Sequence, residues 1–92
     1  MATARAMTCR IDRLSIEQRV VLRISGRIAG EDLEVLRTAL AESRVVAIEL
    51  AEVELVDRAA VELLALNEAN GIELRQCPAY IREWVTRERR RN

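Results

Sequence analysis

The side chains that could carry acid–base chemistry are few in this chain of 92 residues. Two carboxylate pairs, Glu31 with Asp32 and Glu52 with Glu54, have the close spacing that general acid–base catalysis needs. Glu52 and Glu54 would point the same way in an extended segment, because side chains alternate between the two faces of a strand. No residue near either pair indicates a pocket, so solvated acidic surface is the better interpretation of both.

The chain also lacks the residues that usually carry nucleophilic catalysis, metal binding or phosphate binding. The chain contains no histidine, which is the commonest general base and metal ligand. Cys9 and Cys77 are too few and too far apart to indicate a metal site or a disulfide scaffold, and Cys9 falls on the apolar side of a predicted strand as a free thiol. The glycines at positions 26, 30 and 71 match neither the P-loop nor the dinucleotide-binding fingerprint. We therefore expect no enzyme, and no catalytic residue, metal or cofactor.

Composition is typical of one small domain with an aliphatic core. Half of the residues are apolar, and Tyr80 and Trp84 are the only aromatic side chains. The formal net charge is zero, which does not indicate a nucleic-acid-binding protein. Neither a secretory segment nor a run of about 18 apolar residues is present, so we expect a cytoplasmic protein without direct membrane insertion.

The end of the chain departs from this balance. Residues 87–92 carry four arginines and one glutamate. A solvated helix end explains them, because arginine favours the negative end of the helix dipole. Weak contact with RNA or anionic lipid remains the alternative. We describe this stretch as a basic C-terminal tail.

Hydrophobic patterns predict a hairpin and a helix in the first half of the chain. Apolar and polar residues alternate over 7–12, and the apolar residues of 20–25 fall on one face, so we expect two strands joined by a polar loop over 15–19. Gly26 and Gly30 bracket a second loop, and a helix begins at Glu31. Its core stripe consists of Leu33, Leu36 and Leu40.

The second half predicts a strand, a helix, a strand and a last helix. Residues 45–50 are an apolar run typical of a strand covered on both faces, and a short acidic connection over 51–56 follows it. Asp57 is a good N-cap for a helix that extends to about Asn70, where Asn70 and Gly71 stop it. Residues 72–76 are the fourth strand, with Ile72 and Leu74 inward. Pro78 suits the first turn of the last helix, whose docking stripe is Ile81, Trp84 and Val85.

These elements follow the order β-β-α-β-α-β-α, which predicts an α/β fold. We expect a single small domain over 7–86, with a mixed four-stranded sheet and helices packed mainly on one face. Residues 1–6 are expected to be disordered. The second helix has apolar residues around most of its circumference. Burial between the sheet and the last helix explains them, and an edge near Val61 and Ala65 that is exposed to a partner is the alternative.

Residues 50–65, LAEVELVDRAAVELLA, resemble the central motif of STAS domains, which occur in anti-sigma factor antagonists and sulfate transporters. That motif reads Asp-Leu-Ser-Gly-Val, two apolar or aromatic residues, then Asp-Ser-Ser-Gly-Leu and an apolar helix. Glu49 and Leu50 match its first Asp-Leu, and residues 57–60 match Asp-Ser-Ser-Gly. With the flanking strands and helices, the resemblance covers about residues 7–86.

Two departures limit what the resemblance implies. The family's phosphorylated serine or threonine lies two residues after the aspartate, where this chain has Ala59, which cannot be phosphorylated. Arg58 replaces a small residue and places a cation at the positive end of a helix dipole, which is mildly unfavourable. Arg58 is either kept for binding or tolerated on the surface. Its side chain could also pair with Glu62, one helical turn later. Ala60 replaces a small glycine.

The resemblance implies a non-enzymatic protein-interaction module of the anti-sigma factor antagonist type, working by partner switching in transcription regulation. Its partner would be a kinase-type anti-sigma factor. The partner-binding residues would be Asp57, Arg58, Ala59, Ala60, Val61 and Glu62, at the start of the second helix. Without a phosphoacceptor the module would bind constitutively.

Other functions remain open from the sequence. One is a small STAS subunit of an ABC-type lipid-transport complex or a signalling scaffold, with a transporter subunit as its partner. Another is a sensor of nucleotides, for which the chain offers no phosphate cradle beyond the helix start. We expect no nucleic-acid partner, and a homodimer is possible.

Overall fold

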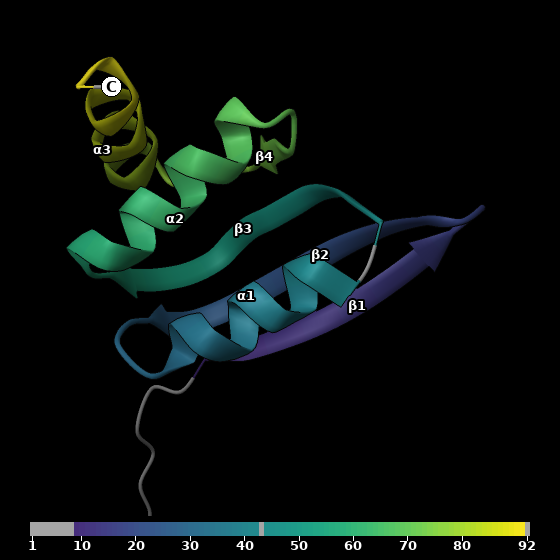
Figure 1. The fold of residues 1–92 in the computed structure, drawn as a ribbon. Helices are drawn as coiled ribbons and strands as arrows, with labels where there is room; N and C mark the ends of the chain where they lie inside the picture. Colours follow the sequence, from purple (N-terminus) through teal and green to yellow (C-terminus); the bar gives the residue numbers. More distant parts are fainter. Residues whose placement is uncertain (1–8, 43, 92) are drawn as a thin grey trace, which may run out of the picture.

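The computed structural model describes residues 9–42 and 44–91, and these form one α/β domain (Figure 1). The order of elements is the one that the sequence predicts. The expected disorder of 1–6 and the first two residues of the predicted strand 7–12 lie outside the described residues. The elements are β1 (Arg10–Ile16), β2 (Arg19–Ile28), α1 (Asp32–Glu42), β3 (Val45–Val56), α2 (Arg58–Ala69), β4 (Glu73–Arg75) and α3 (Ala79–Arg90).

The first two strands form a hairpin that is tighter than predicted. β1 continues to Ile16 and pairs antiparallel with β2, with Ile16 opposite Arg19. Only Glu17 and Gln18 connect them, and both have positive φ, 50° and 69°. Two-residue hairpin turns need such φ values because they match the twist of the strands, and Asn-Gly is their usual sequence. The predicted polar loop over 15–19 was therefore wrong, because its outer residues belong to the strands.

β2 and β3 are both longer than predicted. β2 extends through Gly26 to Ile28, and Gly26 has a φ of 87° beside a register shift against β3. Gly26 is thus a bulge inside a strand, and only residues 29–31 connect β2 to α1. β3 continues through the predicted acidic connection to Val56, with Val53 buried between the exposed Glu52 and Glu54. Strand alternation explains this pattern.

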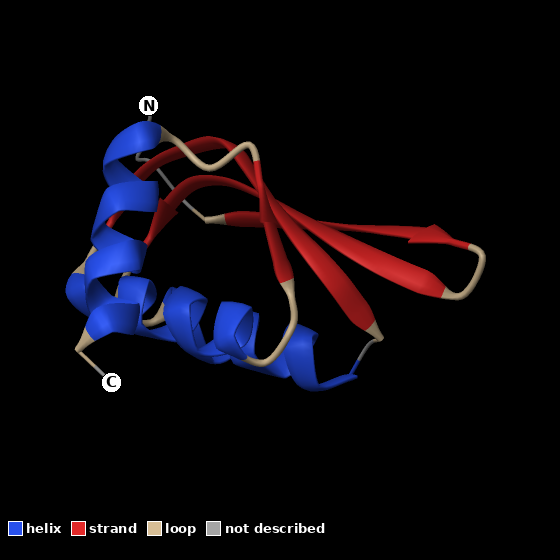
Figure 2. Ribbon diagram, turned by 90° about the horizontal axis from the view of Figure 1, so that it is seen from above, coloured by secondary structure: helices blue, strands red, loops and turns tan. Residues whose placement is uncertain are grey.

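The helices cover one face of the sheet, as predicted (Figure 2). The strand order is β1-β2-β3-β4, and β3 pairs parallel with both β2 and β4. Both crossovers therefore move in the same direction across the sheet. Since such crossovers are right-handed, α1 and α2 must lie on the same face.

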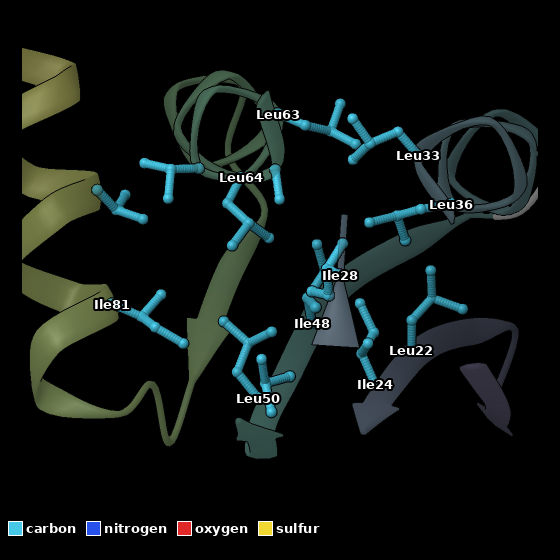
Figure 3. Close-up of a cluster of buried hydrophobic side chains, with 14 of the residues drawn as sticks. Leu22, Ile24, Ile28, Leu33, Leu36, Ile48, Leu50, Leu63, Leu64 and Ile81 are labelled. Atoms are coloured by element: carbon cyan, nitrogen blue, oxygen red, sulfur yellow. The ribbon is translucent and has the colours of Figure 1, made fainter. Parts of the chain in front are cut away.

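The core fills the space between this face and the helices, and it is aliphatic (Figure 3). Leu22 and Ile24 of β2 point toward Leu36 of α1, and Ile48 and Leu50 of β3 face α2 and α3. Leu33 and Leu36 are buried as predicted, with Leu40 packed at the edge of the core. The described residues include no buried polar or charged side chain. The fold is therefore held mainly by apolar burial.

The opposite face of the sheet has a row of alternating charges where a helix layer is absent. The strand registers place Asp12 beside Arg23, Arg23 beside Glu49, and Glu49 beside Arg75. Arg23 Nε lies 3.0 Å from Glu49 Oε1. Opposite charges on neighbouring strands stabilise a sheet by a few tenths of a kcal/mol to about 1 kcal/mol per pair. This row makes the uncovered face compatible with water.

α2 is enclosed by the sheet and α3. Its buried residues include Val61, with none of its surface exposed, and Ala65 with 2%. The suggested exposed edge near Val61 and Ala65 is therefore wrong. The large apolar residue of this helix that is exposed is Leu66, at 59%. Among the described residues, no helix is long and apolar enough to cross a membrane.

Candidate partner-binding site

Asp57 caps α2 and also fastens it to the neighbouring loop. Its Oδ1 accepts a hydrogen bond from the Ala60 N–H at 2.8 Å, which is the predicted N-cap interaction. Its Oδ2 accepts from the Gly30 N–H at 3.0 Å, and its own N–H donates to the Ile28 carbonyl at 3.2 Å. Both carboxylate oxygens are thus used inside the domain. Asp57 positions the site and is not a free charge for a partner.

Apart from Asp57, the residues predicted to bind a partner divide into two groups. Ala60 and Val61 have no exposed surface, so their side chains cannot contact a partner. Arg58, Ala59 and Glu62 are exposed. We call these three residues the contact surface.

Arg58 and Glu62 pair across one turn of α2. Arg58 Nε lies 3.2 Å from Glu62 Oε2, as the four-residue spacing suggested. Both side chains are more than half exposed, so the pair stabilises the domain by no more than a few tenths of a kcal/mol. Arg58 is therefore not held in place by a structural role.

Two exposed apolar side chains come from elements that adjoin α2. Leu55, two residues before Asp57, is 49% exposed at the end of β3. Tyr80, in the first turn of α3, is 47% exposed, and its hydroxyl donates a hydrogen bond to the Glu54 carbonyl. Burial, followed by the nearby Cys77 and Glu54, raises the pKa of Tyr80, so its hydroxyl remains a donor. These side chains place apolar surface next to exposed charge, as in protein interfaces.

An ion-pair cluster that no local sequence pattern predicts fixes α3 against α2. Arg82 makes two hydrogen bonds to Glu68, at 2.8 and 2.7 Å, and Arg89 adds a third at 3.1 Å. The hydrogen bond from Arg82 is the main cause of a lowered Glu68 pKa, and Glu68 in turn raises the pKa of Arg82. Glu68 and Arg82 lie in different helices, 14 positions apart, so no spacing rule pointed to their contact.

α3 also lines a hollow beside the start of α2. Its lining residues are Arg58, Trp84, Arg87, Glu88 and Arg91. From the sequence, Arg87 and Arg91 were predicted to belong to a basic C-terminal tail and Trp84 to the docking stripe of the last helix. α3 continues through Arg90, so these arginines belong to a solvated helix end, as the sequence indicated. The spacing of Trp84, Arg87 and Arg91 at i, i+3 and i+7 was the signal that could have placed them on one face.

The metal-ligating and nucleophilic side chains of the described residues do not gather at one site. The described residues include no group of three metal-ligating side chains. Cys9 and Cys77 are free and half-buried, and burial raises the pKa of both thiols. Ligands of α/β sheets bind where successive crossovers reverse direction, and these crossovers do not reverse.

Comparison of the chain with models of protein families, with curated proteins and with solved structures finds no match. The resemblance to STAS domains therefore rests on residues 50–65, on the order of the elements and on Asp57 at the start of α2. These features lead to a functional proposal and not to a family assignment.

Proposed function

We propose that this chain is a non-enzymatic protein-binding module of the STAS type, resembling anti-sigma factor antagonists. Its contact surface at the start of α2 binds a protein partner, for which a kinase-type anti-sigma factor is the leading candidate. The observation that carries the proposal is the exposed position of Ala59 in the first turn of α2, directly after the N-cap Asp57 and Arg58. This is the position at which STAS domains of the switching type are phosphorylated.

The missing hydroxyl explains how such a module works without a switch. A phosphate at this position would add about two negative charges to the surface that meets the partner. Ala59 accepts no phosphate, so the contact surface keeps one charge state. Binding is then regulated by the abundance of the protein or by competition with a phosphorylatable relative.

The hydrogen bonds of Asp57 support a binding role because they make the surface rigid. Asp57 joins the first turn of α2 to Gly30 in the loop after β2. Arg58, Ala59 and Glu62 therefore project from a fixed helix turn. A preorganised surface loses less conformational entropy on binding, so more of its contact energy appears as affinity.

The test is affinity capture from native lysate with wild type, Ala59→Glu and Ala41→Glu, followed by mass spectrometry. Ala59→Glu adds a charge to the contact surface while favouring the positive end of the α2 dipole, so the domain stays folded. Ala41→Glu makes the same change on an exposed residue near the end of α1, at the other end of β3 from the start of α2. We expect a kinase-type anti-sigma factor to be retained by wild type and Ala41→Glu and lost from Ala59→Glu.

Three other results would favour a different function or refute the proposed contact surface. Transporter subunits with the same pattern of retention and loss would favour the lipid-transport alternative. Partners retained equally by all three proteins would refute the contact surface. A rise in melting temperature with ATP or GTP, without a protein partner, would favour the nucleotide sensor.

A further inference from the structure

The hollow between the start of α2 and the last turns of α3 has a volume of about 320 Å³. We propose that it binds an acidic segment of the partner protein. Carboxylates of that segment pair with Arg58, Arg87 and Arg91, and an adjacent apolar side chain contacts Trp84. This inference rests on the proposed function, since Arg58 belongs to both the contact surface and the hollow, and it adds the chemistry of the partner.

The arginines of α3 divide between two sides of the helix. Arg82 and Arg89 both bond to Glu68 of α2 and hold the helices together. Arg87 and Arg91 are exposed, line the hollow and take part in none of the ion pairs found between described residues. Their guanidinium groups remain available to an anion from outside.

Arg58 brings a third guanidinium group to the hollow from the other helix. Its bond to Glu62 uses Nε, and no hydrogen bond between described residues uses its two Nη groups. A guanidinium group can donate two parallel hydrogen bonds to one carboxylate. Arg58 can therefore keep its bond to Glu62 and still bind a carboxylate of the partner.

Trp84 provides the apolar part of the hollow. It is half-buried, packing against the core on one side and lining the hollow on the other. Tryptophan and arginine are the residues most enriched at the energetic centres of protein interfaces. Their combination here fits a peptide that carries acidic residues beside an apolar one.

Helix electrostatics alone do not account for this cluster. Arginines in the last turn of α3 are favoured by its dipole, which explains Arg87 and Arg91. Arg58 occupies the first position of α2, where the dipole disfavours a cation. Glu88 is the one acid among the lining residues, so positive charge predominates in the hollow. Its volume is at the lower end of small-ligand pockets, which favours a few side chains over a whole nucleotide.

Fluorescence of Trp84 tests the proposal directly, because Trp84 is the only tryptophan of the chain. The probe is the amidated peptide Asp-Glu-Leu-Asp-Glu-Leu-Asp-Glu, and its control has Asn and Gln in place of Asp and Glu. We expect a saturable change in emission with the acidic peptide, none with the control, and weaker binding at higher salt.

Two single variants separate the hollow from general positive charge. Arg87→Gln removes a lining residue and should weaken peptide binding about fivefold. Arg90→Gln removes the same charge from the same helical turn but lies outside the hollow, and should change binding less than twofold. Equal loss in both variants, equal binding of the control peptide, or no emission change with the acidic peptide would overturn the proposal. A response to ATP or inorganic phosphate that depends on Arg87 and is absent with the peptide would overturn it in favour of a phosphate ligand.

The captured partner distinguishes this inference from the proposed function. Loss of the partner from both Ala59→Glu and Arg87→Gln, but not from Arg90→Gln, supports both. Loss from Ala59→Glu alone refutes the acidic-segment inference and leaves the proposed function intact. Loss from Arg87→Gln alone supports the hollow and refutes the contact surface at Ala59.

Discussion

The two sides of α3 show how one helix can serve both the fold and a contact. On the inner side, Ile81 and Val85 are fully buried, and Arg82 is joined to Glu68 by two hydrogen bonds. On the outer side, Arg87 and Arg91 line a hollow and form no ion pair within the described part of the chain. The same residue type, arginine, thus stabilises the domain on one side and remains available on the other.

The largest expected effect is on the inner side. Ile81→Ala should lower the free energy of unfolding by about 3 kcal/mol, because it removes a fully buried side chain and leaves a cavity. Urea denaturation measures the change. Leu66→Ala is the control, since Leu66 is 59% exposed, and it should cost less than about 0.5 kcal/mol. An equal loss of unfolding free energy in both variants would mean that Ile81 does not pack α3 into the core.

Substitution of Asp57 should have the second-largest effect on stability, because Asp57 positions the start of α2. Asp57→Ala should cost about 2 kcal/mol of stability, because it removes the α2 cap and leaves the Gly30 N–H without its acceptor. Asp57→Asn should cost about half as much, since its single carbonyl oxygen can replace one of the two acceptors. Chemical denaturation of the three proteins tests this. Loss of partner binding by Asp57→Ala with unchanged stability would instead make Asp57 a contact residue.

Glu68 should make stability depend on pH. Its pKa is lowered in the folded protein, so the stability that it contributes is present above the unfolded-state value of about 4.3 and is lost as pH falls through the folded-state pKa. Glu68→Gln should cost about 1–2 kcal/mol at pH 7. The difference in free energy of unfolding between wild type and Glu68→Gln should then become smaller below about pH 4.

The control for Glu68 is Glu83→Gln. Glu83 is exposed on α3, and its substitution should lower stability by less than about 0.5 kcal/mol at every pH. Urea denaturation at pH 7, 5 and 3.5 would compare the two. If the difference in free energy of unfolding between wild type and Glu68→Gln stays constant across this pH range, the ion pairs of Glu68 do not stabilise the domain as described.

The smallest effect on stability is expected on the outer side. Arg87→Gln should leave the free energy of unfolding within about 0.5 kcal/mol of wild type. Arg82→Gln should lower it by about 1 kcal/mol, because it breaks both hydrogen bonds to Glu68. Thermal unfolding of this matched pair tests the division of α3 into two sides. A larger loss of stability for Arg87→Gln than for Arg82→Gln would contradict the division of α3 into a structural side and an available side.

Local patterns predicted the order of the elements and the cap of α2. Asp57 was identified as the N-cap because a carboxylate before an apolar helix satisfies unpaired N–H groups. The turn at Glu17 and Gln18 could not be predicted, because neither residue prefers positive φ and the pairing of the strands imposes it. Gly26 was taken for a loop residue because a bulge and a turn both favour glycine.

The site was harder to predict than the fold, because it depends on which helix faces are covered. Val61 and Ala65 were candidates for an exposed edge, and packing of α3 and the sheet buries them. The link between Asp57 and Gly30 joins residues 27 positions apart, which no local pattern shows. The hollow likewise needs Arg58 of α2 and Trp84 of α3 in one place.

The most direct test of the account is the affinity of the captured partner for wild type, Ala59→Glu and Ala41→Glu, measured by isothermal titration calorimetry. We expect at least tenfold weaker binding for Ala59→Glu, equivalent to about 1.4 kcal/mol. We expect less than a twofold change for Ala41→Glu, with all three proteins folded. Equal affinity of wild type and Ala59→Glu would contradict the claim that the start of α2 binds the partner.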